Sequence, residues 1–133
     1  MAIIYRPASS ADVDAIQKLG SSAFECEWSR QDAERQLWAR TKVIEVDEEI
    51  CGMITFADAG DSISITTVAV SPAHQDKGYG KLMLSNVLSE LAGAPQVTIE
   101  ARFKNPRLVK LYQSFGFVIE SERELSYFMR LCR

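Results

Sequence analysis

The sequence has little of the material from which several classes of functional site are built. It contains one histidine and three cysteines, Cys26, Cys51 and Cys132, which lie far apart in the chain. A disulfide framework or a zinc site needs such residues in greater number and at closer, regular spacing. We therefore expect no disulfide framework and no metal cofactor.

Basic residues and long apolar runs are also scarce. The formal net charge at pH 7 is -3, whereas a nucleic-acid-binding domain usually has a strongly basic face. No apolar run approaches the roughly 20 residues of a membrane-spanning helix, and the first residues lack the charged start and apolar centre of a signal peptide. We expect no nucleic-acid partner, no membrane partner and a cytoplasmic location.

The residues that are present have the composition of a globular protein. Hydrophobic residues make up 47% and charged residues 25% of the 133 positions, which is ordinary for a chain with a packed core. No linker, repeat or low-complexity tract interrupts the sequence, and the length is typical of one domain. We expect a single domain over residues 1–133.

Strand-like and helix-like periods alternate along the chain. Segments rich in Val, Ile and Thr predict strands, and apolar residues at i, i+3, i+4 and i+7 predict helices. The predicted order is β-α-α-β-β-β-α-β-α-β-β, an α/β fold with a mixed, mostly antiparallel sheet of about seven strands and about four helices on its two faces. The predicted strands cover 2–6, 42–46, 50–58, 62–70 and 96–102, with a hairpin over 117–131, and the first two helices cover about 10–19 and 30–39.

Two pairs of polar residues mark where the first two helices begin. Ser9 precedes Asp12 by three positions, and Ser29 precedes Asp32 by the same interval. This is the spacing of a capping box, in which each residue of the pair bonds the backbone N–H of the other. The sequence therefore predicts helix starts at these two places.

The stretch QDKGYGK, residues 75–81, joins a predicted strand to a predicted helix. A helix N-terminus offers unpaired N–H groups and partial positive charge, and its glycines let an anion approach the backbone. Lys77 and Lys81 can add counter-charge, so the segment has the chemistry of a phosphate site. A plain turn that uses two glycines accounts for the same residues, and both interpretations remain open. Neither the P-loop nor the dinucleotide fingerprint fits this spacing.

Two motifs resemble a known family. QDKGYG resembles the Gln/Arg-x-x-Gly-x-Gly/Ala motif of the GNAT superfamily of acyl-CoA-dependent N-acetyltransferases, and like that motif it follows a strand and precedes a helix. EARFKNPRLVKLYQSFGF is similar to a second signature, Glu-x-x-x-x-Asn before a helix with Leu-Tyr that ends in Gly-Phe. The segment 23–29, AFECEWS, is similar to a loop of the subgroup that acetylates the N-terminal alanine of ribosomal proteins.

The resemblance implies that acetyl-CoA is the co-substrate. The backbone of residues 75–81 would hold its pyrophosphate, the Gln75 side chain would fix the turn, and the main chain of residues 68–70 would bind the pantetheine arm. A strand N–H there can polarise the thioester carbonyl, although the valines can equally be plain core residues. Asn105 would lie near the cofactor, cap the following helix, or do both. The implied cofactor-binding residues are Val68, Ala69, Val70, Gln75, Asp76, Lys77, Gly78, Tyr79, Gly80, Lys81 and Asn105.

The resemblance also implies two catalytic residues. Glu100 stands in the place of the general base, which must take a proton from an acceptor ammonium of pKa about 10.4. Tyr112 stands in the place of the general acid, which donates to the leaving sulfur of the thioester. Burial in the middle of the sheet would raise the pKa of Glu100 and so favour its role as a base. Alternatively, Glu100 is a surface carboxylate paired with Arg102. The alternative for Tyr112 is a core aromatic residue without a catalytic role. Trp28 would line the acceptor site or anchor its loop on the core.

The implied reaction is transfer of an acetyl group to a primary amine by direct attack in a ternary complex. No cysteine lies within either motif to suggest a covalent acetyl-enzyme. The connection between the last two strands, ESERE, is shorter than is usual in the ribosomal-protein subgroup. The sequence therefore does not decide whether the acceptor is a protein N-terminus, a lysine, or a small amine or polyamine. The rival function is a non-catalytic sensor of acyl-CoA. The sequence leaves the choice between monomer and homodimer open.

Overall fold

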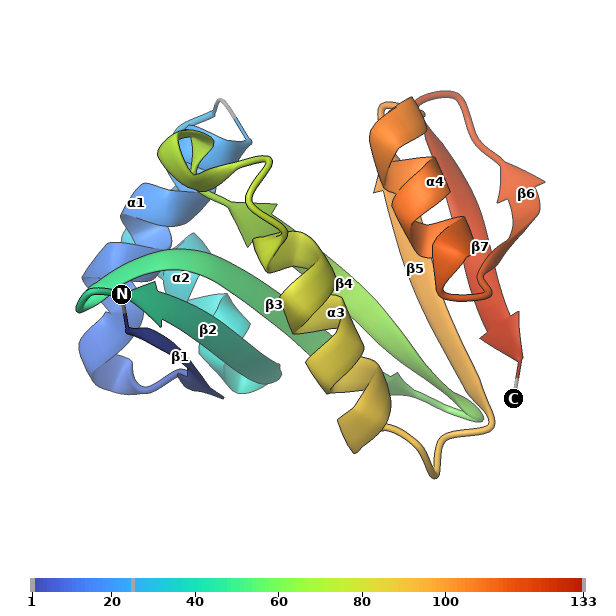
Figure 1. Cartoon of the computed structure of the whole chain (residues 1–133), viewed down its shortest axis with the longest axis horizontal. Helices are drawn as coiled ribbons and strands as arrows, with labels where there is room; N and C mark the ends of the chain where they lie inside the picture. The colour runs from blue at the N-terminus through green and yellow to red at the C-terminus, as the bar shows by residue number, and fades with distance from the viewer. Residues whose placement is uncertain (1, 25, 133) are drawn as a thin grey trace. The chain divides into compact units, whose positions relative to one another are not determined.

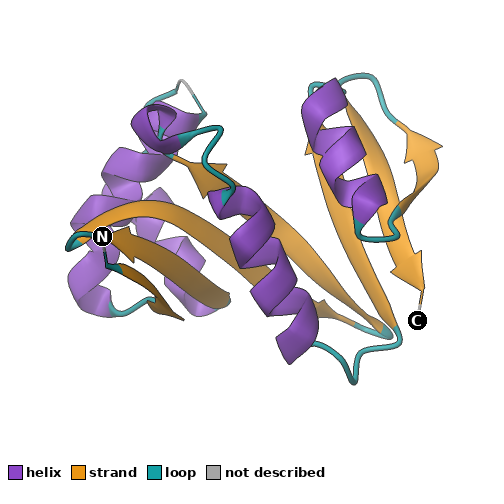
Figure 2. Cartoon of the chain, viewed as in Figure 1, coloured by secondary structure: helices purple, strands orange, loops and turns teal. Residues whose placement is uncertain are grey.

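The computed structural model describes residues 2–24 and 26–132 (Figure 1). Over these residues the strands hydrogen-bond in the order β1-β2-β3-β4-β5-β7-β6 and form one mixed, seven-stranded sheet. The strands are β1 (Ile3–Pro7), β2 (Arg40–Val46), β3 (Glu49–Ala59), β4 (Ser62–Val70), β5 (Gln96–Arg102), β6 (Val118–Glu122) and β7 (Ser126–Cys132). The helices are α1 (Val13–Ala23), α2 (Arg30–Trp38), α3 (Tyr79–Glu90) and α4 (Pro106–Ser114), with short 3-10 turns η1 (Ser10–Asp12) and η2 (Pro72–His74). The predicted order of elements and fold class are confirmed (Figure 2).

The described residues form two compact units. Of the described residues, the first unit contains 2–24, 26–56 and 67–89, and the second contains 57–66 and 90–132. Strands β3 and β4 contribute to both. The two units are described in turn, because each carries a different part of the predicted site.

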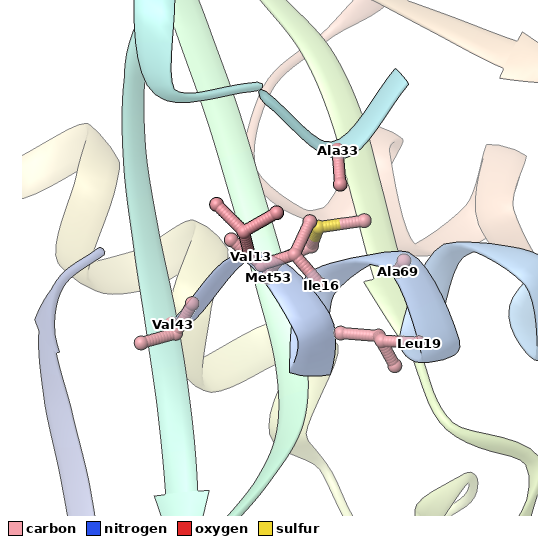
Figure 3. Close-up of a cluster of buried hydrophobic side chains, with 7 residues drawn as sticks. All are labelled: Val13, Ile16, Leu19, Ala33, Val43, Met53 and Ala69. Atoms are coloured by element: carbon pink, nitrogen blue, oxygen red, sulfur yellow. The ribbon is translucent and has the colours of Figure 1, made fainter. Parts of the chain in front are cut away.

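In the first unit, helices cover both faces of the sheet. Met53 of β3 points into a cluster of buried side chains from α1, α2, β2, β3 and β4 (Figure 3). Its neighbour Gly52 faces the other way, because a Cβ built there would lie 3.2 Å from the Cε of Met83 on α3. Helices α1 and α2 therefore lie on one face and α3 on the other, which agrees with the prediction that helices occupy both faces of the sheet. The members of the cluster are Val13, Ile16, Leu19, Ala33, Val43, Met53 and Ala69.

A polar network inside the first unit ties α2 to the sheet. The Gln36 side-chain oxygen accepts hydrogen bonds from the hydroxyls of Thr55 (3.0 Å) and Thr67 (3.1 Å). The Thr55 hydroxyl also lies 2.8 Å from that of Thr41. Thr41 and Thr55 are both buried, and buried polar groups are costly unless they are hydrogen-bonded. This network satisfies them and fixes the position of the helix.

In the second unit, β5 is the central strand. It pairs in parallel with β4 through Ile63, Ser64 and Ile65, and antiparallel with β7 from Gln96 to Arg102. Strand β6 pairs antiparallel with β7, with a register shift between Ile119 and Ser121. The predicted terminal hairpin is confirmed, although β6 includes three of the five residues of the predicted polar connection, 120–124.

The predicted helix starts are confirmed, and one predicted helix end is wrong. The Ser9 backbone N–H donates to the Asp12 carboxylate (2.8 Å), and Ser29 with Asp32 forms a second reciprocal pair. The first helix was expected to end at Leu19, but α1 continues to Ala23. Gly20 suggests a stop when read alone; in the fold it provides room for Trp28, whose ring carbons would lie 2.3 Å from a Cβ at that position. No helix of the described residues is long and apolar enough to cross a membrane.

Candidate active site

The turn between β4 and α3 is hydrogen-bonded to both β3 and β4. The Ser71 N–H donates to the Cys51 carbonyl (2.8 Å) and the His74 N–H donates to the Ser71 carbonyl (2.9 Å). The Gln75 side-chain amide reaches back to the Val70 carbonyl (3.2 Å). Gln75 therefore bridges the turn to the end of β4, which is consistent with its expected role in fixing the turn.

Two residues of this turn have left-handed backbone conformations. Asp76 has φ of 65° and Gly78 has φ of 82°. The Gly78 carbonyl accepts the first helical hydrogen bond, from the Leu82 N–H (2.9 Å). The N–H groups of residues 79–81 therefore belong to the first turn of α3, where helical geometry provides no partner for them.

The space above this helix start is open. A Cβ built on Gly78 would meet no atom within 4 Å, so the glycine is required for its φ value and not for packing. Lys77 and Lys81 are both exposed at the rim. Unpartnered N–H groups, partial positive charge and two exposed lysines thus lie within one short, accessible segment, and these are the features that favour the binding of a phosphate.

Other side chains of the turn have structural roles. Tyr79 is buried, with 5% of its surface exposed, and its ring centroid lies 6.3 Å from that of His74. His74 shares a 2.7 Å hydrogen bond between its Nδ1 and the Ser71 hydroxyl. These contacts give His74 a structural role in the turn, and they leave only the backbone of Tyr79 available to a ligand.

Residues 68–70 lie at the end of β4. Ala69 points into the buried cluster of the first unit, while Val68 and Val70 are half-buried. Ala69 is thus a core residue, whereas the two valines keep part of their surface exposed and are not enclosed in the core. Whether these residues contact a cofactor stays a prediction.

Trp28 is anchored on α1. Its ring stacks on Phe24, with centroids 5.8 Å apart, and its backbone N–H donates to the Ser21 hydroxyl (2.9 Å). Its carbonyl accepts a hydrogen bond from the Gln17 side chain (2.9 Å). This geometry supports the interpretation of Trp28 as a loop anchor; Glu25 of the same loop lies outside the described residues.

In the second unit, Glu100 extends from β5 and remains accessible. Its side chain is 39% exposed, and its carboxylate lies 3.4 Å from a guanidinium nitrogen of Arg123. The expected burial in the middle of the sheet is therefore wrong. The expected alternative partner was Arg102, but Arg123 reaches Glu100 because the turn between β6 and β7 brings it beside β5. No local signal in the sequence could have found this pairing, since the two residues are 23 positions apart.

Tyr112 is enclosed on α4. Only 2% of its surface is exposed, and its ring lies 6.2 Å from that of Phe117. Burial raises the pKa of Tyr112 to about 12, an effect that the nearby charge of Arg102 partly offsets. The phenol is therefore neutral, and able to donate a hydrogen bond, throughout the ordinary pH range.

Asn105 caps α4, as its position before Pro106 predicted. The Asn105 side-chain oxygen accepts a hydrogen bond from the Arg107 N–H (2.9 Å). Just before it, Phe103 and Lys104 have left-handed φ values of 56° and 50°, which non-glycine residues rarely adopt. Lys104 also forms an ion pair with Glu122 of β6, so the loop after β5 is fastened to the terminal hairpin.

With this geometry described, a comparison with known families decides the classification. Residues 13–117 match the acetyltransferase (GNAT) family, which is most of the chain. The chain belongs to that family. It is accordingly an acyltransferase enzyme of the N-acetyltransferase type.

Individual relatives of this GNAT protein agree with the assignment. The ribosomal protein bS18-alanine N-acetyltransferase of Salmonella typhimurium is 26% identical over 116 residues, which cover 82% of this chain and 76% of that protein. The crystal structure of the Escherichia coli ribosomal-protein-S18-alanine N-acetyltransferase superposes with a TM-score of 0.88 at 19% identity, covering 98% of this chain and 94% of that one. Arabidopsis thaliana Naa50, solved with the bisubstrate analogue CoA-Ac-MVNAL, gives a TM-score of 0.85 at 16% identity over 100% of both chains. At these identities, the two structures establish the shared fold.

The predicted site residues of the GNAT protein fall into two sets. The first unit holds Trp28, residues 68–70 and the turn 75–81, and the second unit holds Glu100, Asn105 and Tyr112. In the described residues, no group of three or more His, Cys, Asp or Glu side chains is placed to hold a metal ion. Sequence reasoning missed Arg123, the residue that the fold sets against Glu100.

Proposed function

We propose that this enzyme transfers an acetyl group from acetyl-CoA to the N-terminal amine of a peptide or protein. The observation that carries the proposal is the turn over residues 75–81, where a left-handed glycine opens the start of α3 to solvent between two lysines. Two relatives support a peptide acceptor: one is named for acetylating an alanine of a ribosomal protein, and the other was solved with an analogue that joins coenzyme A to a peptide.

The turn would bind the pyrophosphate of the cofactor through main-chain N–H groups. Gln75 supports this role by holding the turn to β4, and Lys77 and Lys81 supply charge from the rim. The main chain of residues 68–70 would bind the pantetheine arm, and one of its N–H groups would polarise the thioester carbonyl. Asn105 would combine its observed role as a helix cap with a place near the cofactor.

Glu100 would act on the acceptor amine. The acceptor arrives as an ammonium, and only its neutral form can attack the thioester carbon. Glu100 is accessible from solvent, so it can take the proton directly or through one water molecule. The amine nitrogen then forms a bond to the carbonyl carbon, the carbon–sulfur bond breaks, and coenzyme A leaves as a thiol.

Tyr112 would stabilise the leaving sulfur as a hydrogen-bond donor. Its pKa of about 12 lies roughly three units above that of a free thiol, about 8.5. Complete proton transfer from Tyr112 to the thiolate is therefore unfavourable, and a neutral O–H that points to the developing negative charge serves better. The proton that coenzyme A finally carries would come from solvent or from the attacking nitrogen, which loses a second proton as the amide forms.

Calorimetric titration with acetyl-CoA, followed by a thiol-release assay over a panel of peptides and small amines, tests this function. Tight binding with turnover on peptides is the expected result. Turnover on polyamines or other small amines alone would show that the acceptor is a small molecule and not a peptide. Binding of acetyl-CoA without turnover on any amine would indicate a non-catalytic sensor. A single domain over residues 1–133, a cytoplasmic location and a monomeric or homodimeric state stay predictions.

A further inference from the structure

The ion pair between Arg123 and Glu100 places a cation where the acceptor amine has to arrive. A guanidinium nitrogen of Arg123 lies 3.4 Å from the Glu100 carboxylate, and the two side chains are 57% and 39% exposed. A contact of that length is at the limit of a hydrogen bond, and exposed pairs of this kind contribute little free energy. An incoming ammonium can therefore displace Arg123 from its ion pair with Glu100 at a small cost in free energy.

Arg123 stays beside the site even when it loses Glu100. Its guanidinium carbon lies 5.1 Å from the centre of the Phe128 ring, and Phe128 is the cross-strand partner of Glu100 on β7. Cross-strand partners lie on the same face of a sheet, so the ring supports the cation next to the carboxylate. The Arg123 N–H also closes the hairpin by donating to the Ser126 carbonyl (2.8 Å).

A neighbouring arginine shows what a fixed ion pair looks like in the same hairpin. Arg130 lies over the same Phe128 ring, at 5.7 Å. Its guanidinium binds both carboxylate oxygens of Glu120 and the side-chain oxygen of Gln96. Arg130 is thus fully engaged, whereas Arg123 holds Glu100 through a single long contact.

From this arrangement we propose that Arg123 selects acceptors that carry a carboxylate next to the reactive amine. Once the acceptor ammonium occupies Glu100, the guanidinium has lost its anion but remains at the site on Phe128. A side-chain carboxylate on the second residue of the acceptor peptide can then pair with the Arg123 guanidinium. A guanidinium and a carboxylate can form two parallel hydrogen bonds, that is, a bidentate ion pair. The preferred substrates are peptide N-termini with Asp or Glu in the second position, and a basic second residue is repelled.

This inference rests on the proposed function, because it takes Glu100 as the group that receives the acceptor amine. Three peptides that differ only in having Glu, Gln or Lys in the second position provide the test. For the wild-type enzyme we expect kcat/KM to be about five- to tenfold higher for the Glu peptide than for the Gln peptide, as one charge-assisted contact provides. The Lys peptide should be the poorest. The preference should appear mainly in KM, because the contact is present in the ground state and the transition state alike.

Two variants of Arg123 and one control make the test specific. Arg123→Gln should remove the preference, and Arg123→Glu should reverse it in favour of the Lys peptide. Arg130→Gln removes the other arginine on Phe128 and should keep the wild-type preference. Thermal unfolding and the affinity for acetyl-CoA, measured for each variant, establish that the fold and the cofactor site are intact.

The outcomes separate this inference from the proposed function. Equal turnover of the three peptides by the wild type, or an unchanged preference in Arg123→Gln, would overturn the role of Arg123 and leave peptide acetylation standing. Failure of the wild type to acetylate any peptide while it binds acetyl-CoA would overturn both. If Arg123→Glu folds poorly, Arg123→Lys replaces it in the test. Lysine keeps the positive charge but cannot form the bidentate ion pair of a guanidinium. A smaller preference for the Glu peptide over the Gln peptide would then support the proposal.

Discussion

At the scale of single residues, Gly78 shows how one backbone angle creates a candidate ligand site. Its φ of 82° is in the region that favours glycine, and the volume above it is open. The residue therefore has two separable effects, one on the stability of the turn and one on access to the N–H groups of α3. A comparison with another glycine of the same geometry can distinguish them.

The matched pair is Gly78→Asp and Gly60→Asp. Gly60, in the turn between β3 and β4, has φ of 73°, and a Cβ added there would likewise meet no atom within 4 Å. Each substitution should destabilise the fold by about 1 kcal/mol, because a side chain disfavours positive φ. Only Gly78→Asp should also weaken acetyl-CoA binding, by tenfold or more, since it sets a carboxylate where the pyrophosphate would lie. If the calorimetric affinity for acetyl-CoA falls equally in both variants, the turn over residues 75–81 is not the pyrophosphate site.

Tyr112 has a consequence for stability at high pH. Its pKa rises from 10.0 to about 12 on folding, so the folded state keeps a neutral phenol where the unfolded chain has ionised. The stabilising effect is complete below pH 10 and is lost as the pH rises toward 12. A shift of two units corresponds to about 2 to 3 kcal/mol.

Substitution of this residue by phenylalanine tests both its titration and its catalytic role. The free energy of unfolding of Tyr112→Phe, measured by denaturant titration, should fall less between pH 10 and 12 than that of the wild type. The same variant should bind acetyl-CoA with nearly unchanged affinity and turn over at least tenfold more slowly, because the hydrogen bond to sulfur is gone. Turnover equal to the wild type would leave Tyr112 as a core residue.

At the scale of secondary-structure elements, α1 and the loop after it depend on one close contact. Gly20 lies under the Trp28 ring, and Trp28 closes the loop through hydrogen bonds with Ser21 and Gln17. Helix propensity favours alanine over glycine at such a position by about 1 kcal/mol. Packing opposes that preference, because the added carbon would lie 2.3 Å from the ring.

Packing should prevail in Gly20→Ala. We expect a net destabilisation of about 1 to 3 kcal/mol, as for other overpacked sites, together with a shift in tryptophan fluorescence as the ring moves. Gly93→Ala is the control, because a Cβ at Gly93 meets nothing within 4 Å. A Gly20→Ala protein as stable as the wild type would mean that Trp28 is not held against α1.

The ends of the elements show how far local sequence reaches. Serine and aspartate three positions apart predicted the first two helix starts, since both partners of a capping box lie within one turn of chain. The end of α1 was missed because the deciding contact comes from Trp28, beyond the helix itself. Strand boundaries were close to those observed, and for β4 and β5 they were the same.

At the scale of the whole molecule, one arginine joins three elements, β1, η1 and β2, through ion pairs. Arg6 of β1 binds both carboxylate oxygens of Asp12, at 2.8 Å and 2.9 Å, and also pairs with Glu45 of β2. The Asp12 side chain is only 9% exposed. The hydrogen bonds from Arg6 hold the pKa of Asp12 below its usual value.

Acid should therefore weaken the fold through Asp12. A lowered pKa stabilises the protein above the unfolded value, near 3.8, and that contribution is lost as the pH falls through the folded value. Asp12→Asn should cost about 1 to 3 kcal/mol at pH 7 and make the stability less dependent on pH below 5. Asp14→Asn is the control, because its ion pair with Arg30 is exposed and contributes little. Equal losses of unfolding free energy in the two variants would contradict this account.

The sequence by itself determined the order of elements, the helix starts, the turn over residues 75–81 and the family, because each depends on residues that are close together in the chain. The tertiary structure decided three things that the sequence could not show: that Arg123 faces Glu100, that Trp28 rests on Gly20, and that Tyr112 is buried deeply enough to raise its pKa to about 12. The physical reason is the same in each case. Strand register and packing set these contacts and this burial, and neither can be read from spacing along the chain.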